Sequence, residues 1–107
     1  MRMWNVEPKI MCRQHLLGEH LEMHMFAGTL RKGKPIDGWA KRGQCISTQI
    51  KQRHDELMEE MVRRGYNHKS PMDVNPTDIE VGWVDPAANL VELANRCTAC
   101  AELQDSA

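Results

Sequence analysis

Apolar residues recur at helical spacing in three stretches of the chain. In the first, residues 9–30, a step of about 100° per residue places one set of apolar side chains on a single stripe, made of Cys12, Leu16, Met23, Phe26 and Leu30. A second apolar strip nearly opposite consists of Leu17, Leu21 and Met25. The pattern predicts a long central helix that packs on two sides against the chain or a partner.

The second stretch, residues 45–64, has its apolar side chains on one helical face, formed by Ile46, Ile50, Leu57 and Met61. Ser47 or Thr48 is available as a capping residue near its start. Gly65 follows two arginines, and glycine readily adopts the left-handed conformation that terminates helices. These features predict a helix that ends at residue 64.

The third stretch, residues 85–103, opens with Asp85 and Pro86, a capping residue followed by proline at the first helical position. Its apolar positions are Leu90, Val91, Ala94 and Ala101. The sequence therefore predicts a third helix. A turn-rich loop with glycines and a proline precedes the second helix, and a connection of about twenty residues precedes the third. We expect that long connection to be functional or to contain a short turn of helix.

A chain of 107 residues supports one hydrophobic core, and no repeat or linker divides it. The predicted fold class is all-α, a compact single domain over residues 1–107 with three main helices, a basic loop and a long second connection. No apolar run is long enough to span a membrane, and the N-terminal residues lack the apolar stretch of a signal peptide. We therefore expect a cytoplasmic protein whose four cysteines are free thiols.

Charge is distributed unevenly, although the formal net charge is only −1. Between Arg31 and Arg53 there are seven basic residues and one acid, Asp37, whereas the rest of the chain has seven basic residues and fourteen acids. A near-neutral protein can thus present one basic face to a polyanion. A solvated loop without a partner is the alternative interpretation of this segment.

Polar residues interrupt the first predicted helix along one ridge, which carries His15, Gly18, Glu19 and Glu22. Carboxylates this close to a core need cationic partners or a functional role, so the two glutamates either pair with another helix or belong to a site. Gly18 weakens a helix, which indicates close approach of another helix or of a ligand.

The opening Met-Arg with its following apolar pair, the segment QHLLGEHLEMH at 14–24 and the segment ELMEEMVRRGYNHK at 56–69 carry a resemblance. Together they resemble the pyrimidine-dimer DNA glycosylases of the phage endonuclease V type. The resemblance implies that the α-amine of Met1 is the catalytic nucleophile and that Glu22 is the catalytic carboxylate. It also implies a glycosylase with abasic-site lyase activity that needs no metal or cofactor, from a bacterium or a phage-infected cell.

The chemistry of an α-amine suits this role. Its pKa lies near 7.7–8.0, so a useful fraction is neutral at cellular pH, whereas lysine at about 10.4 is mostly protonated. Initiator methionine is generally retained before a bulky residue such as Arg2, and a nearby Arg2 would lower the amine pKa further. Glu22 could stabilise a cationic imine and then remove the sugar 2′ proton, which leads to strand scission by β-elimination.

The expected partner is double-stranded DNA with a damaged pyrimidine, such as a cyclobutane dimer, bound by a monomer. The expected substrate-binding residues are Arg2, Gln14, His15, Gly18, Arg31, Lys32, Lys34, Lys41, Arg42, Arg63 and Arg64. Trp39 in the basic loop could stack in opened DNA or anchor the loop to the core. We assign Trp4 and Trp83 to packing.

Two departures from the family leave other functions open. Leu21 and Met25 stand where the resemblance leads us to expect basic residues, and an aromatic, basic C-terminal tail is replaced by NRCTACAELQDSA. The protein could therefore act on another modified base, act only on abasic sites, or bind DNA through the same scaffold without turnover.

Cys97 and Cys100 raise the alternative of a structural metalloprotein. A zinc site needs four ligands, and the chain has no second Cys-x-x-Cys, so further ligands would have to come from the other helices, among Cys12, Cys45, His20 and His24. A redox role would need a strand-turn-helix context that this segment lacks. We favour two packed thiols on a helix and expect no metal.

Overall fold

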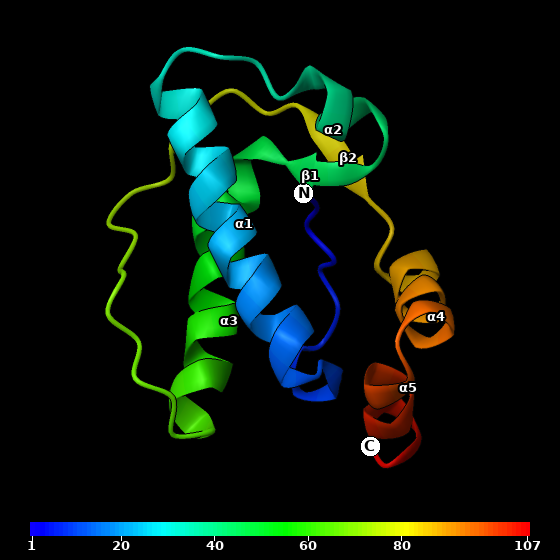
Figure 1. Cartoon of the computed structure of the whole chain (residues 1–107). Helices are drawn as coiled ribbons and strands as arrows, with labels where there is room; N and C mark the ends of the chain where they lie inside the picture. The colour runs from blue at the N-terminus through cyan, green and yellow to red at the C-terminus, as the bar shows by residue number, and fades with distance from the viewer.

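The computed structural model describes all of residues 1–107, and its centre is a pair of antiparallel helices (Figure 1). These are α1, Arg13–Arg31, and α3, Ile50–Arg63. Two shorter helices, α4 (Pro86–Arg96) and α5 (Thr98–Asp105), lie to one side, and the N-terminal segment passes between them and α1. The molecule is flat, with extents of 41 × 30 × 15 Å.

The remaining elements are short. They comprise the 3-10 turns Pro8–Ile10 (η1) and Ser47–Gln49 (η2), helix α2 (Asp37–Lys41), and strands β1 (Gln44–Ile46) and β2 (Gly82–Val84). The two strands pair antiparallel, with Cys45 opposite Trp83. Because 59% of the residues are helical and the sheet is so small, the predicted class of a mostly helical single globule is confirmed.

Helix α1 begins later than predicted, at Arg13 rather than residue 9. Pro8 starts a separate 3-10 turn, and Cys12 caps α1 by accepting the backbone N–H of His15 on its sulfur at 3.5 Å. Leu16, Met23 and Phe26 of the predicted core stripe are fully buried. The second strip is wrong in part, because Leu21 is 60% and Met25 is 47% exposed where no other element covers α1.

The second predicted helix is shorter than expected at its start. Gln44–Ile46 pairs as β1 with a strand that lies far along the chain, so α3 begins only at Ile50. Its end agrees with the prediction, since Gly65 has φ +83° and donates its N–H to the Val62 carbonyl.

The third predicted helix is divided in two at Cys97, which ends α4 and caps α5. Its start is confirmed, because Asp85 accepts the N–H of Ala88 and Pro86 is in the first turn. The predicted core face is wrong: Leu90 and Val91 are exposed, whereas Asn89 and Leu93 are buried against the N-terminal segment and the core.

The long connection between α3 and β2 is ordered by side-chain hydrogen bonds rather than by the predicted turn of helix. Asn75 donates to the Ser47 carbonyl and accepts the N–H of Lys51, each at 3.0 Å. Ser47 donates to the Ile79 carbonyl and accepts the N–H of Val81. These bonds bring Gly82–Val84 alongside β1. None of the helices is both long and apolar enough to cross a membrane.

Candidate active site

The first residues of the chain are held in place by hydrogen bonds from successive backbone N–H groups. Arg2 donates its N–H to Oε1 of Glu22 at 2.7 Å, Met3 donates to the Gln44 carbonyl at 2.7 Å, and Trp4 donates to Oε2 of Glu19 at 3.1 Å. Only the Cα and carbonyl carbon of Met1 separate its amine from the N–H that Glu22 accepts. The α-amine and the Glu22 carboxylate are therefore neighbours.

A surface cavity of about 480 Å³ opens at this point. Its lining comes from the N-terminal segment, α1, α2 with the residue after it, β1 and α4, and consists of Met1, Arg2, Trp4, His15, Glu22, Trp39, Arg42, Gln44 and Arg96. Glu22 is the only carboxylate among three arginines and the amine. The cavity therefore suits an anionic ligand, and Glu22 provides a carboxylate beside the amine.

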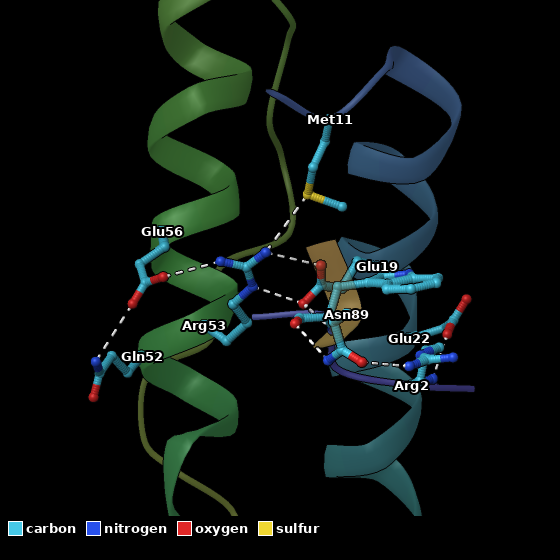
Figure 2. Close-up of polar contacts among 9 residues, drawn as sticks. Arg2, Met11, Glu19, Glu22, Gln52, Arg53, Glu56 and Asn89 are labelled. Atoms are coloured by element: carbon cyan, nitrogen blue, oxygen red, sulfur yellow. Dashed lines mark hydrogen bonds and ion pairs between the residues drawn. The ribbon is translucent and has the colours of Figure 1, made fainter. Parts of the chain in front are cut away.

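Arg2 is positioned by α4 rather than left free in the cavity. Its guanidinium stacks 3.9 Å from the ring centre of Trp4 and pairs with Glu92 at 2.5 Å. It also donates to Oδ1 of Asn89 at 2.7 Å (Figure 2). Asn89 in turn donates to the Trp4 carbonyl at 2.8 Å. These contacts fix the N-terminal segment from the side opposite α1, while Glu92 compensates part of the Arg2 charge.

Beneath the cavity, Glu19 forms a buried ion pair with Arg53 of α3 (Figure 2). Arg53 donates Nε to Oε2 at 2.6 Å and Nη2 to Oε1 at 2.9 Å, and the two residues are only 1–2% exposed. Burial raises the pKa of Glu19, and the hydrogen bonds from Arg53 oppose that rise. Because arginine stays protonated, the bidentate pair retains Glu19 as a carboxylate.

The two glutamates of the ridge thus have different partners. The expectation that an acid on this ridge pairs with another helix is confirmed for Glu19, which turns toward the core and Arg53. Glu22 lies one turn further along α1, is half-buried and faces the N-terminal amine side. Glu19 therefore fixes the helix pair, and Glu22 remains available for chemistry.

Trp39 both anchors α2 and lines the cavity. Its ring stands edge-to-face on Phe26, with ring centres 5.6 Å apart and planes at 88°. Trp4 is buried, as expected, and also meets the edge of His15. Trp83 departs from the packing role assigned to it, because it is 55% exposed, although its ring lies close to Gly43.

Gln44 and Arg96 are cavity residues that the sequence did not indicate. Gln44 accepts from Nε of Arg42 at 3.3 Å, and Arg96 lies 5.4 Å from the ring centre of Trp4. Arg96 reaches the cavity only because α4 returns beside the N-terminal segment. No local sequence signal marks that long-range arrangement.

The predicted basic face is present only in part, because Lys51 pairs with Asp55 and Arg53 is buried against Glu19. The end of α1, the following loop and α2 lie at one end of the molecule (Figure 1). This region carries five exposed basic side chains, which are those of Arg31, Lys32, Lys34, Lys41 and Arg42. None of them forms an ion pair. Of these, Arg42 also lines the cavity, so the basic face and the cavity adjoin.

Two predicted DNA contacts lie elsewhere. Arg63 and Arg64 both pair with Glu60 at the far end of α3, and Arg64 also donates to the carbonyls of Pro8 and Met11. The structure does not bring them to the cavity, and Arg64 has a visible structural role in fixing the segment before α1.

Gln14 and Gly18 lie on α1 outside the cavity lining. Gln14 is exposed in the first turn of the helix. Gly18 is half-buried, and a Cβ added there would meet nothing within 4 Å. No second helix packs at Gly18, so of the two explanations for this glycine only close approach by a ligand stays open.

Two groups of side chains have the composition and spacing of metal ligands. One consists of Cys12, His15, Cys97 and Cys100, and the other of His20, His54 and His68. In the second group His54 has both ring nitrogens engaged, with Asp55 at 2.8 Å and the Ser70 carbonyl at 3.0 Å. A metal bound to either nitrogen of His54 would displace one of these two contacts, which disfavours a metal at the second group.

Comparison with known proteins assigns the larger, N-terminal part of the chain to a family. Residues 1–74 match the family model of the pyrimidine dimer DNA glycosylases. Because this match covers well over half of the chain, the protein belongs to that family of DNA repair glycosylases, as the resemblance predicted. No curated protein and no solved structure matched the chain significantly. The matched residues include Met1, Glu22 and the basic face but neither α4 nor α5.

Proposed function

We propose that the protein excises damaged pyrimidines from double-stranded DNA and cuts the strand at the resulting abasic site, with the Met1 α-amine as nucleophile. The observation that carries this proposal is the hydrogen bond of Glu22 to the N–H of Arg2, which holds a carboxylate beside the amine. The family assignment supports a glycosylase, and this geometry supports the amine-and-carboxylate mechanism. The proposed mechanism requires a free α-amine at Met1.

In the first step the neutral amine attacks C1′ of the damaged nucleotide. A bond forms between the Met1 nitrogen and C1′, and the glycosidic bond breaks with its electron pair leaving on the base, which takes up a proton. The amine loses a proton and the sugar ring opens to give a protonated imine. Glu22 stabilises the positive charge that develops next to it.

In the second step Glu22 accepts the proton from C2′. The electrons of that C–H bond form a double bond toward C3′, and the C3′–O bond breaks with the phosphate as leaving group. Water then hydrolyses the imine, which releases an unsaturated aldehyde on the DNA and restores the Met1 amine. No oxidant, reductant or metal takes part in this sequence.

DNA binding falls to the basic face and the cavity arginines. The exposed cations next to the cavity support sequence-independent contacts with phosphates. The target nucleotide must leave the base stack for the amine to reach its sugar. Trp39 at the cavity wall offers a ring beside the point where the duplex would open.

A second candidate function is DNA binding without turnover, or action on a different lesion. It is favoured by Leu21 and Met25, which expose apolar surface on the α1 face where the family resemblance leads us to expect basic residues. With fewer cations on this face, the protein would bind a distorted duplex less tightly. The double variant Leu21→Arg/Met25→Arg should then bind DNA more tightly.

The test uses protein without an N-terminal tag and end-labelled duplexes that contain an abasic site or a cyclobutane pyrimidine dimer. The proposal predicts strand cutting at both lesions, with the β-elimination product at the new 3′ end. Cutting at abasic sites alone would assign the protein to a lyase with another base preference. Salt-sensitive binding without any cutting would contradict the enzyme proposal and leave the DNA-binding scaffold.

A further inference from the structure

Four side chains from the two ends of the chain meet beside η1. The sulfur atoms of Cys12, Cys97 and Cys100 and a ring nitrogen of His15 all lie within 4.8 Å of one another. Sγ of Cys12 is 3.8 Å from Sγ of Cys97 and 3.3 Å from Nδ1 of His15. Sγ of Cys100 is 3.7 Å from the same Nδ1.

The separations of 3.3–3.8 Å are close to those between the corners of a metal-centred tetrahedron. With Zn–S near 2.3 Å and Zn–N near 2.0–2.1 Å, tetrahedral geometry puts two sulfurs roughly 3.8 Å apart and a sulfur roughly 3.6 Å from a nitrogen. A disulfide would need about 2.05 Å between sulfurs. All four cysteines of the chain are free thiols, so no disulfide joins the three cysteines of this group.

Each half of the group is a short turn at a helix start. Cys12 caps α1 with His15 three residues later, and Cys97 caps α5 with Cys100 three residues later. In both turns the backbone N–H of the later residue points at the sulfur of the earlier one at 3.5 Å. The N–H of Cys12 also donates to Sγ of Cys100 at 3.2 Å. Hydrogen bonds of this kind around the ligand atoms hold the side chains of a metal site in position.

We propose that Cys12, His15, Cys97 and Cys100 bind one Zn²⁺ ion as a structural site. Three thiolates and one imidazole are a ligand set that zinc prefers, and four protein ligands leave no open position for a substrate. This proposal replaces the expectation of no metal. His15 is then a zinc ligand through Nδ1, although it also lines the cavity.

Such a site would join the C-terminal helices to the family core. α5 lies outside the residues that match the family model, and the two halves of the site attach its start to the start of α1. α4, which precedes α5 directly, holds Arg2 and Trp4 through Asn89. Zinc would therefore fix the helices that position the N-terminal segment. Zinc binding at these four residues does not depend on the proposed DNA chemistry.

Metal content and cobalt spectroscopy test the proposal without an activity assay. Protein purified under reducing conditions without chelators should contain about one zinc per chain by elemental analysis. The metal-free reduced protein, titrated with Co²⁺, should show the visible bands of tetrahedral cobalt together with thiolate charge-transfer absorption in the near ultraviolet. Saturation should occur at one equivalent.

Variants assign the ligands. Cys97→Ser should lose most of the bound zinc, whereas Cys45→Ser, which removes a thiol buried at β1, should retain it. His20→Gln should also retain the metal, because it changes the other histidine group. If Cys97→Ser fails to fold, the cobalt spectrum of the unaltered protein still decides between thiolate ligands and none.

Three results would overturn the proposal. The first is a reduced, folded protein that takes up no zinc or cobalt. The second is a cobalt spectrum without thiolate charge transfer. The third is metal that persists in Cys97→Ser and is lost in His20→Gln, which would move the ion to the histidine group.

Discussion

Oε1 of Glu22 accepts the backbone N–H of Arg2 at 2.7 Å. Because the donor belongs to the backbone and not to a mobile side chain, the carboxylate is held next to the first residue of the chain. Glu22 is half-buried on α1, and α1 is itself fixed to α3 by the Glu19–Arg53 pair. The relationship between amine and carboxylate is therefore built into the core packing.

Replacement of Glu22 by Gln tests its chemical role. The amide is of similar size and its oxygen still accepts the Arg2 N–H, but it cannot take the C2′ proton. We expect strand cutting at an abasic site to fall by about 10²- to 10⁴-fold, while DNA binding changes little. Single-turnover cutting and a binding titration measure both. Equal losses in Glu22→Gln and in the unrelated variant Glu102→Gln would remove Glu22 from the mechanism.

Replacement of Arg53 by Met should strongly destabilise the fold. The change leaves Glu19 buried without its cation, a situation that costs about 3–5 kcal/mol. The double variant Glu19→Gln/Arg53→Met should recover part of the loss, because the amide oxygen still accepts the Trp4 N–H. Urea unfolding measures all three proteins. A single variant as stable as the parent would show that the pair contributes little.

Stability should fall as the solution becomes acidic. Burial lowers the pKa of His20 to about 4 and also lowers the pKa values of His24 and His68, next to His54 and Asp55. These imidazoles are neutral in the folded protein but take up protons near pH 6.5 when unfolded. Their contribution is therefore complete above about pH 6.5 and is lost as the pH falls toward 4.

Urea unfolding between pH 7.5 and 4 checks this prediction, with His20→Gln as the comparison. The variant should depend less steeply on pH, and the difference between the two proteins cancels any loss of metal at low pH, which affects both. Parallel curves for the two proteins would contradict the assignment to His20.

Replacement of Gly18 by Ala should stabilise α1 by roughly 0.5–1 kcal/mol, because alanine is the better helix former and a Cβ there meets no protein atom. If DNA approaches this position, the same variant should bind duplex DNA less tightly. Gly28→Ala is the matched control, since it lies in the same helix with equally open surroundings. Unchanged DNA binding in Gly18→Ala would remove Gly18 from the proposed interface.

The sequence predicted features that depend on local chemistry. The Asp85–Pro86 helix start and the Gly65 helix end follow from backbone preferences, and both are present. The need of Glu19 for a cationic partner followed from the cost of burying a charge, although Arg53 could not be singled out.

Features that depend on distant segments were not predictable in this way. β1 exists because Gly82–Val84 returns beside it, and Gly82 has φ +94° with no room for a side chain next to the Cys45 carbonyl. Cys12 was one of four residues that could have joined Cys97 and Cys100, and only the meeting of two helix starts singles it out. Periodicity placed Leu90 in the core, but the arrangement of α4 buries Asn89 instead.

Covalent trapping with borohydride tests the central claim most directly. The tag-free protein is incubated with a duplex that contains an abasic site, the imine is reduced, and the cross-linked peptide is mapped by mass spectrometry. The account predicts one adduct on the α-amine of Met1 that disappears when this amine is acetylated. An adduct on a lysine side chain, or no adduct while the DNA is still cut, would contradict the N-terminal amine mechanism.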